Sequence, residues 1–300
     1  MSGIEELAGK AAVVTGGASG IGKGIAQALK AEGMNVVIAD IEPGALDEAA
    51  EEIGAVGVVA DVSSLDSVRA LAEEARRRFG TVHVVCNNAG VGSGARLADM
   101  TARDWDWILG VNLRGVINGV EAFLPMLSAN SDGGHIVNTA SMSGLRVRPN
   151  AGAYAVTKFG IVALTETLAM ELEADGSKVG ATVICPGMVY TNIKSSTRNR
   201  PGVLGGGALA DYDIETTELG ARMRWLDPIE VGRIAVQAIK RGDLYAITHP
   251  EQISEVEARH RGIEAAFRKA QDQNSGPGPF PNPAHPGEGR DPGQVGTVPQ

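Results

Sequence analysis

The sequence of 300 residues has few aromatic residues, few cysteines and an excess of negative charge. Phe, Trp and Tyr make up 4 % of a chain that is 43 % hydrophobic, so the core must consist mainly of Ala, Val, Ile and Leu. A formal charge of −9 argues against a nucleic-acid partner, because binding to phosphates requires a basic surface. No apolar run approaches the ~20 residues of a membrane span, and the N-terminus shows no signal-peptide pattern. We therefore expect a cytoplasmic protein that binds neither membranes nor nucleic acids.

The two cysteines and five histidines do not indicate disulfide or metal chemistry. Cys86 and Cys185 each lie in an apolar, strand-like run, and we interpret them as small core residues of a protein in a reducing compartment. The histidines are scattered and lack the spacing of zinc ligands. We predict that the protein holds no metal.

Short apolar runs alternate with helical patterns along most of the chain. Strands are predicted at 11–15, 36–40, 56–61, 82–87, 135–139, 182–185 and 244–248. Helices are predicted at 21–32, 44–53, 65–79, 101–127, 153–174, 228–241 and 251–270. Such alternation is typical of a parallel sheet with helices on both faces. The sequence therefore predicts an α/β fold, a doubly wound Rossmann-type sheet in one catalytic domain over residues 1–270.

Two segments interrupt this alternation. Residues 192–227 have mixed charge, three consecutive glycines and little helical pattern, which is typical of a lid or binding loop. Residues 274–300 contain seven of the fourteen prolines and six glycines, a composition that buries too little surface to offset the entropy of ordering. We expect a lid at about 192–227 and a disordered tail at 274–300.

A glycine-rich turn joins the first predicted strand to the first predicted helix. Gly16 permits a tight turn, and Gly20 and Gly22 allow the amides of a helix N-terminus to approach the pyrophosphate of a dinucleotide. The motif G-x-G-x-x-G does not fit, since Ile25 replaces its last glycine. The phosphate loop of nucleoside triphosphatases nearly fits, but it fails at Gly24, where a hydroxyl should hold magnesium.

Asp40 ends the second predicted strand, eighteen residues after Gly22. Its carboxylate can accept hydrogen bonds from both hydroxyls of an adenosine ribose and would repel a 2′-phosphate. Ser19 and Ile41 carry no charge, so neither supplies a cation for that phosphate. This pattern predicts NAD rather than NADP as the cofactor. The alternative role of Asp40 is to cap the turn that follows it.

Tyr154 and Lys158 are four residues apart in a predicted helix and therefore share one face. A neighbouring ammonium favours the phenolate. We expect this ammonium, together with a nicotinamide-ribose network in a pocket that excludes water, to bring the pKa of Tyr154 from ~10 to between ~7 and ~8. Ser141 follows a predicted strand, at the sheet edge where ligands bind in such folds. Loops at 88–90 and 186–187 follow two further strands and reach the same edge. Together these groups predict hydride transfer to or from a carbonyl.

The ordered set of motifs resembles the short-chain dehydrogenase/reductase family, in its compact single-domain branch. The resemblance covers about residues 6–250, and no motif position departs from the family pattern. It implies a seven-stranded sheet in the order 3-2-1-4-5-6-7 and a homodimer or homotetramer. The motifs are Thr15-Gly16-x-x-x-Gly20-x-Gly22, Asp61-Val62, Asn87-Asn88-Ala89-Gly90, Asn112, Ser141, Tyr154-x-x-x-Lys158 and Pro186-Gly187-x-Val189-x-Thr191.

The resemblance also implies roles for individual residues. Tyr154 would exchange a proton with the substrate oxygen, Lys158 would lower the pKa of Tyr154 and bind the nicotinamide ribose, and Ser141 would position the substrate oxygen. Asn112 would hold a water that links Lys158 to bulk solvent. These four are the predicted catalytic residues. The predicted NAD-binding residues are Gly16, Ser19, Gly20, Ile21, Gly22, Asp40, Ile41, Asp61, Val62, Asn88, Ala89, Gly90, Tyr154, Lys158, Pro186, Gly187, Val189 and Thr191.

The predicted function is NAD-dependent interconversion of a secondary alcohol and a ketone on a small-molecule substrate. Apolar residues of the lid, with Met142 and Met188, would form an apolar pocket for hydrophobic substrates, cyclic ones included. The lid residues could equally pack on the sheet edge. The alternative function is an NAD-binding sensor or scaffold without turnover, although such a protein would be expected to lack Tyr154 or Lys158.

Overall fold

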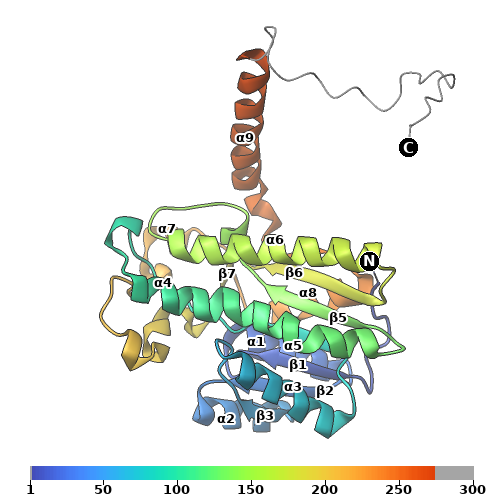
Figure 1. Cartoon of the computed structure of the whole chain (residues 1–300). Helices are drawn as coiled ribbons and strands as arrows, with labels where there is room; N and C mark the ends of the chain where they lie inside the picture. Colours follow the sequence, from blue (N-terminus) through green and yellow to red (C-terminus); the bar gives the residue numbers. More distant parts are fainter. Residues whose placement is uncertain (1, 274–300) are drawn as a thin grey trace, which may run out of the picture. The chain divides into compact units, whose positions relative to one another are not determined.

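The computed structural model describes residues 2–273, and seven parallel strands form its central sheet. Their order is β3-β2-β1-β4-β5-β6-β9, which confirms the predicted fold class and strand order. Strands β3, β2, β1, β5 and β6 follow one another in this order from bottom to top in Figure 1. The connections leave β1 and β4 in opposite directions, so a crevice is expected where these two strands end side by side. The strands are β1 (Ala11–Thr15), β2 (Asn35–Asp40), β3 (Val56–Val59), β4 (Val84–Asn87), β5 (Gly134–Thr139), β6 (Val179–Cys185) and β9 (Tyr245–Ile247).

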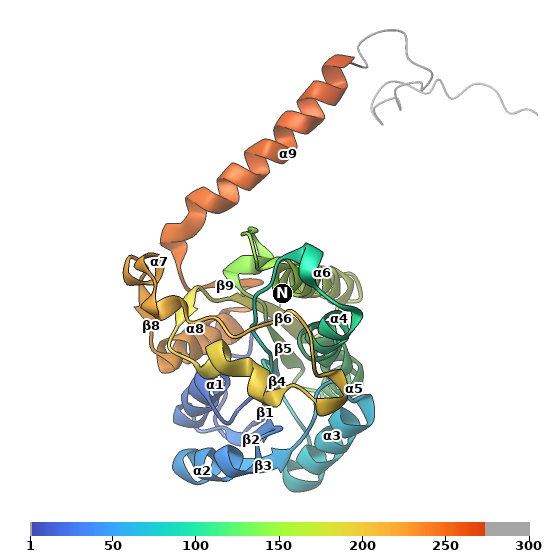
Figure 2. The same ribbon diagram turned by 90° about the vertical axis from the view of Figure 1, so that its left-hand side faces the viewer.

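Helices cover both faces of the sheet (Figure 2). Every residue of β1, β4, β5 and β6 is therefore buried, whereas the edge strand β3 alternates between half-buried and exposed positions. One face is covered by α1 (Gly20–Ala31), α2 (Pro43–Ile53) and α8 (Pro228–Arg241). The other is covered by α3 (Leu65–Phe79), α5 (Gly115–Ala129) and α6 (Gly152–Ala174). Each face has its own apolar core, centred on Ile25 and Val231 in the first and on Leu71 and Phe123 in the second.

The predicted helix at 101–127 consists of three consecutive helical segments. Helix α4 (Ala102–Leu109) starts with a capping box between Thr101 and Asp104. One turn of π-helix (Gly110–Arg114) follows and leads into α5. A π turn inserts one residue into the helical repeat, and such turns frequently occur at functional sites. Here the insertion contains Asn112, one of the predicted catalytic residues, and turns its side chain into the interior.

The predicted lid contains more regular structure than its sequence pattern indicates. Its turns of 3₁₀ helix are η4 (Asn192–Asn199), η5 (Gly202–Leu204) and η6 (Ile214–Thr216), followed by the short helix α7 (Glu218–Ala221). Strand β8 (Trp225–Leu226) pairs in parallel with β7 (Met188–Val189), a pairing that was not predicted. Strands of two residues are too short to show a period of two in the sequence.

The remaining elements are short turns and a C-terminal helix. The turns are η1 (Leu97–Asp99), η3 (Met142–Gly144) and η7 (Pro250–Gln252). A second unit starts at Ser254 and contains nearly all of α9 (Ile253–Gln273), so the predicted C-terminal helix is present. The domain boundary near 270 stays a prediction, and the predicted tail at 274–300 lies outside the described residues. Across residues 2–273, no helix is both long and apolar enough to cross a membrane.

Candidate active site

A cavity of about 820 Å³ lies at the carboxyl ends of the strands, where the loops after β1, β2, β4, β5 and β6 meet. Two of the predicted site residues, Gly22 and Asn112, do not line it. The predicted residues that do line it are Gly16, Ser19, Gly20, Ile21, Asp40, Ile41, Asp61, Val62, Asn88, Ala89, Gly90, Ser141, Tyr154, Lys158, Pro186, Gly187, Val189 and Thr191.

The glycine turn after β1 exposes backbone to the cavity. Gly16 has a φ of +66°, and a Cβ at this position would lie 2.8 Å from the Cα of Ala89. Helix α1 begins without a side-chain cap and without an acid in its first turn, so its first amides and the positive end of its dipole can receive an anion. Gly22 lies behind the cavity wall, where a Cβ would be 2.0 Å from the carbonyl oxygen of Gly16. Its role in the structure is close packing of α1 against the turn.

Hydrogen bonds from Thr15 fasten this turn to the loop after β4. The Oγ1 of Thr15 accepts from the backbone amides of Asn88 at 2.9 Å and Ala89 at 3.1 Å. The side-chain amide of Asn88 donates to the Thr15 carbonyl oxygen at 3.0 Å. These bonds give two neighbouring loops of the cavity a fixed relative position.

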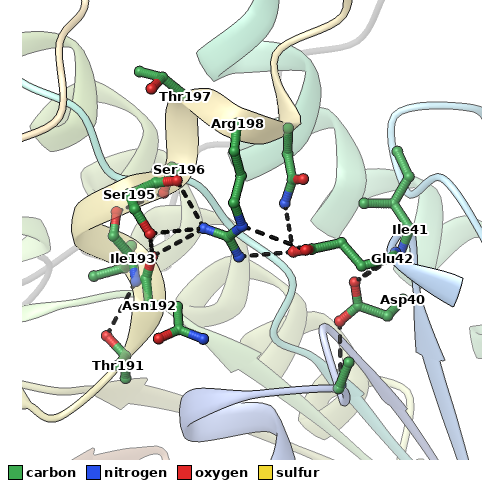
Figure 3. Close-up of polar contacts among 12 residues, drawn as sticks. Asp40, Ile41, Glu42, Thr191, Asn192, Ile193, Ser195, Ser196, Thr197 and Arg198 are labelled. Atoms are coloured by element: carbon green, nitrogen blue, oxygen red, sulfur yellow. Dashed lines mark hydrogen bonds and ion pairs between the residues drawn. The ribbon is translucent and has the colours of Figure 1, made fainter. Parts of the chain in front are cut away.

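The carboxylate of Asp40 is held in the cavity wall by three backbone amides (Figure 3). One oxygen accepts from Ile41 at 2.7 Å and from Glu42 at 3.2 Å, and the other accepts from Ala18 at 3.1 Å. Asp40 therefore caps the turn that follows β2 and lines the cavity as well, so the alternative role raised from the sequence also holds. Asp61, in the next loop, is similarly fixed by Ser63, whose hydroxyl donates to it at 2.7 Å.

Ser141, Tyr154 and Lys158 meet at the other side of the cavity. Tyr154 is in the first turn of α6, and the Nζ of Lys158 lies 5.4 Å from the centroid of its ring. The same ammonium donates to the carbonyl oxygen of Thr139 at 2.9 Å. Ser141 accepts from the amide of Ser143 at 3.1 Å and shares a hydrogen bond with the phenol of Tyr154.

Burial controls the protonation of the Tyr154–Lys158 pair. Burial raises the pKa of Tyr154 to about 12, and the hydrogen bond with Ser141 opposes this rise. Burial also lowers the pKa of Lys158 to about 8. That Lys158, together with a bound nicotinamide ribose, lowers the pKa of Tyr154 stays a prediction. The ammonium lies over the ring and bonds to Thr139, and it does not offset the desolvation of the phenol.

The side chain of Asn112 is hydrogen-bonded to the backbone of the loop after β4. Its Oδ1 accepts from the amide of Val91 at 2.7 Å, and its Nδ2 donates to the carbonyl oxygen of Val91 at 2.9 Å. The Nδ2 also donates to the hydroxyl of Thr157 at 3.3 Å. Asn112 thus connects the π turn, this loop and α6, where its partner Thr157 directly precedes Lys158. Its role in holding a water stays a prediction.

His249 supports the site and was not recognised in the sequence. The ring is fully buried, with Nδ1 3.1 Å from the amide nitrogen of Gly187 and Nε2 3.1 Å from the carbonyl oxygen of Arg224. Because an amide N–H can only donate, Nδ1 must accept and Nε2 must carry the proton. His249 thereby joins the turn after β6 to the segment before β8. Its two partners are 62 and 25 residues away, so no local pattern could reveal this role.

Aromatic residues gather around the cavity although the chain contains few of them. The lid contributes Tyr212 and Trp225, and α4 contributes Trp107. Leu204 and Leu209 of the lid pack against Trp107 instead of lining the cavity. Both roles left open for the lid residues therefore occur. Among residues 2–273, no group of three or more His, Cys, Asp or Glu could hold a metal ion.

Comparison with known proteins agrees with this geometry. The family model for short chain dehydrogenases matches residues 10–202. The C alpha-dehydrogenase of Sphingobium sp. is 31 % identical over 267 residues, which is 87 % of each chain. The structure of a short-chain dehydrogenase/reductase from Burkholderia phymatum in complex with NAD has a TM-score of 0.81 and 38 % identity, covering 88 % of this chain and 97 % of that one.

A mycobacterial relative is more similar over a shorter stretch. The probable oxidoreductase EphD of Mycobacterium tuberculosis is 41 % identical over 189 residues, which is 61 % of this chain. The match spans only 32 % of that protein, so this chain corresponds to about a third of its length. The family-model match, the match to the Sphingobium relative and the arrangement of the site lead to one conclusion. The chain belongs to the short-chain dehydrogenase/reductase family of oxidoreductases.

Proposed function

We propose that the protein is an NAD-dependent oxidoreductase that interconverts a secondary alcohol and a ketone on an apolar substrate. One observation carries this proposal: Ser141, Tyr154 and Lys158 line the same cavity as the glycine turn and Asp40. A proton-transfer group and a dinucleotide-sized binding surface thus line one cavity. We keep the prediction that the reaction takes place in the cytoplasm.

The residues of the cavity fit a dinucleotide. The uncapped N-terminus of α1 and the space beside Gly16, which a Cβ would fill, suit a pyrophosphate. The fixed carboxylate of Asp40 suits the two hydroxyls of an unphosphorylated ribose, which favours NAD over NADP. When bound, NAD or NADH would accept or supply the hydride. Val189 and Thr191 would hold the nicotinamide end.

The protonation of Tyr154 suits reduction of a ketone. A phenol kept neutral by burial can donate its proton to the substrate oxygen as hydride reaches the carbonyl carbon. Ser141 can donate a hydrogen bond to the same oxygen and stabilise its developing charge. The Lys158 ammonium beside the ring then stabilises the phenolate that remains. In the oxidation direction the same groups act in reverse.

The aromatic lining indicates the class of substrate. Trp107, Tyr212 and Trp225 contribute aromatic side chains to the cavity lining, and Met142 and Met188 add flexible apolar ones. We propose a secondary alcohol or ketone that carries an aromatic or alicyclic ring. A sensor without turnover remains the alternative function, and the presence of both Tyr154 and Lys158 argues against it.

Turnover by the purified full-length chain tests this proposal. Ring-substituted ketones with NADH, and the matching alcohols with NAD, should change the absorbance of NADH at a rate proportional to enzyme. Parallel assays with NADPH and NADP should be slower. Binding of NADH without turnover of any substrate in the panel would favour the sensor instead.

A further inference from the structure

The turn η4 connects the two ends of the cavity. It follows Thr191, at the end proposed to hold nicotinamide, and its last residues reach Glu42, two residues after Asp40 (Figure 3). It is also attached along its length, since the buried Ser196 accepts from the amide of Gly92 at 3.0 Å. This segment therefore spans the opening of the cavity from the proposed nicotinamide end to the proposed adenosine end.

The guanidinium of Arg198 is held by Glu42 on one side and by residues of η4 on the other. Its Nε and Nη2 donate to the two carboxylate oxygens of Glu42 at 3.3 Å and 2.7 Å. Its Nη1 donates to the carbonyl oxygen of Asn192 at 3.2 Å and to that of Ser195 at 2.7 Å. Asn199 adds a further donor to Glu42 at 2.8 Å. The hydrogen bond with Arg198 is the main reason that the pKa of Glu42 is lowered.

The ion pair between Arg198 and Glu42 contributes little to the stability of the fold. The side chains of Arg198 and Glu42 are 37 % and 34 % exposed, and ion pairs of this exposure contribute little to folding free energy. The pair instead fixes the position of the Arg198 guanidinium at the cavity wall. Asp40, Glu42 and Arg198 all line this cavity. A guanidinium is also the group that best recognises a phosphate, because its forked donors match the phosphate oxygens.

We propose that Glu42 is a second determinant of cofactor selectivity beside Asp40. Asp40 repels a 2′-phosphate directly, and Glu42 withholds from that phosphate the guanidinium of Arg198. Loss of the Glu42 charge frees the donors of Arg198 to bind the 2′-phosphate of NADP. This inference rests on the preference for NAD proposed above.

The test measures dissociation constants for NADH and NADPH by fluorescence titration of the full-length chain, independently of turnover. Asp40→Asn serves as the background, because it removes the direct repulsion. Adding Glu42→Gln to it should tighten NADPH binding about tenfold, as expected for a new charged hydrogen bond. NADH binding should change by less than about threefold.

Two matched controls isolate the role of Arg198. Glu52→Gln in the same background removes an equal charge from an ion pair with Lys23, whose residues do not line the cavity, and should leave NADPH binding unchanged. Arg198→Met added to the Asp40→Asn, Glu42→Gln protein should abolish the gain. The inference is overturned if Glu42→Gln acts no differently from Glu52→Gln, or if the gain persists without Arg198.

The unaltered protein separates this inference from the proposed function. Tighter binding of NADPH than of NADH by the unaltered protein would contradict the proposed NAD preference and Glu42 selectivity together. A preference for NADH with no effect of Glu42→Gln would overturn only the role of Glu42.

Discussion

Lys158 carries a positive charge in a buried position, and this combination is unfavourable for folding. Its side chain is 3 % exposed, and burial lowers its pKa to about 8 from an ordinary value of 10.5. That difference corresponds to about 3 kcal/mol of destabilisation while the amine is protonated. Such a residue is retained for its chemistry, since many active sites reduce the stability of the fold.

Replacing Lys158 by Met should therefore stabilise the protein at pH 7 while abolishing turnover. Removal of the buried charge should raise the free energy of unfolding by about 2 kcal/mol, part of the gain being offset by the lost bond to Thr139. Between pH 8 and 10.5 the unfolded chain binds a proton that the native lysine has released, so the unaltered protein gains stability as the pH rises. The difference between the two proteins should shrink over this range.

Urea denaturation at pH 7 and pH 10 measures both effects. A Lys158→Met protein that is less stable at pH 7, or whose advantage is the same at both pH values, would contradict the assignment of a buried charge to this residue.

The meeting of Ser141, Tyr154 and Lys158 at one cavity could be predicted from sequence, but their electrostatics could not. Ser141 and Tyr154 are recognisable because they keep fixed spacing relative to strands and helices. The pKa of Tyr154 depends on burial and on its hydrogen bond with Ser141. Neither quantity can be read from the spacing of four residues.

At the scale of secondary-structure elements, the turn after β6 depends on contacts from distant parts of the chain. The carbonyl oxygen of Pro186 accepts from the amide of Met142, the residue after Ser141, at 2.9 Å. The amide of Gly187 contacts Nδ1 of His249 at 3.1 Å and the hydroxyl of Thr248 at 3.2 Å. These bonds fix the direction in which the chain leaves β6, and so the position of β7 and of Thr191 after it.

His249→Phe should impair cofactor use more than it impairs folding. A planar ring is kept, but one of the two acceptors for the Gly187 amide and the donor to Arg224 are lost, at a cost of about 1–3 kcal/mol in unfolding free energy. We expect the KM for NAD to rise about tenfold, because the turn no longer holds the nicotinamide end in place. His249→Asn places an acceptor near the position of Nδ1 and should restore most of the KM.

Steady-state kinetics and urea denaturation of both variants separate positioning from stability. If the two variants lose the same stability and show the same KM, His249 acts only as a packing residue. An unchanged KM in His249→Phe would also exclude the positioning role.

The elements that sequence patterns failed to predict are those held by long-range contacts. The long α6 has a clear helical pattern and ends where expected. The two residues of β8 form a strand only because β7 lies beside them. The π turn at Asn112 likewise follows from its bonds to Val91, and periodicity cannot distinguish it from the helix around it.

At the scale of the whole molecule, the topology creates the site. Most predicted motifs follow a strand, whereas Asn112 and the Tyr154–Lys158 pair lie in helical segments. Because parallel strands carry their loops to one edge, a common site for most of the motifs was predictable before any contact was known. Which lid residues reach the cavity was not predictable, because Tyr212 lines it while the nearby Leu209 is buried against Trp107. The homodimer or homotetramer stays a prediction.

The most direct measurement compares Tyr154→Phe with the unaltered protein in two assays at once. Turnover of a ring-substituted ketone with NADH reports proton transfer, and quenching of protein fluorescence reports NADH binding. Removal of the proton donor should lower kcat at least about 100-fold, whereas the dissociation constant for NADH should change by less than about threefold. Full turnover by Tyr154→Phe would contradict the account, because the proton would then come from another group.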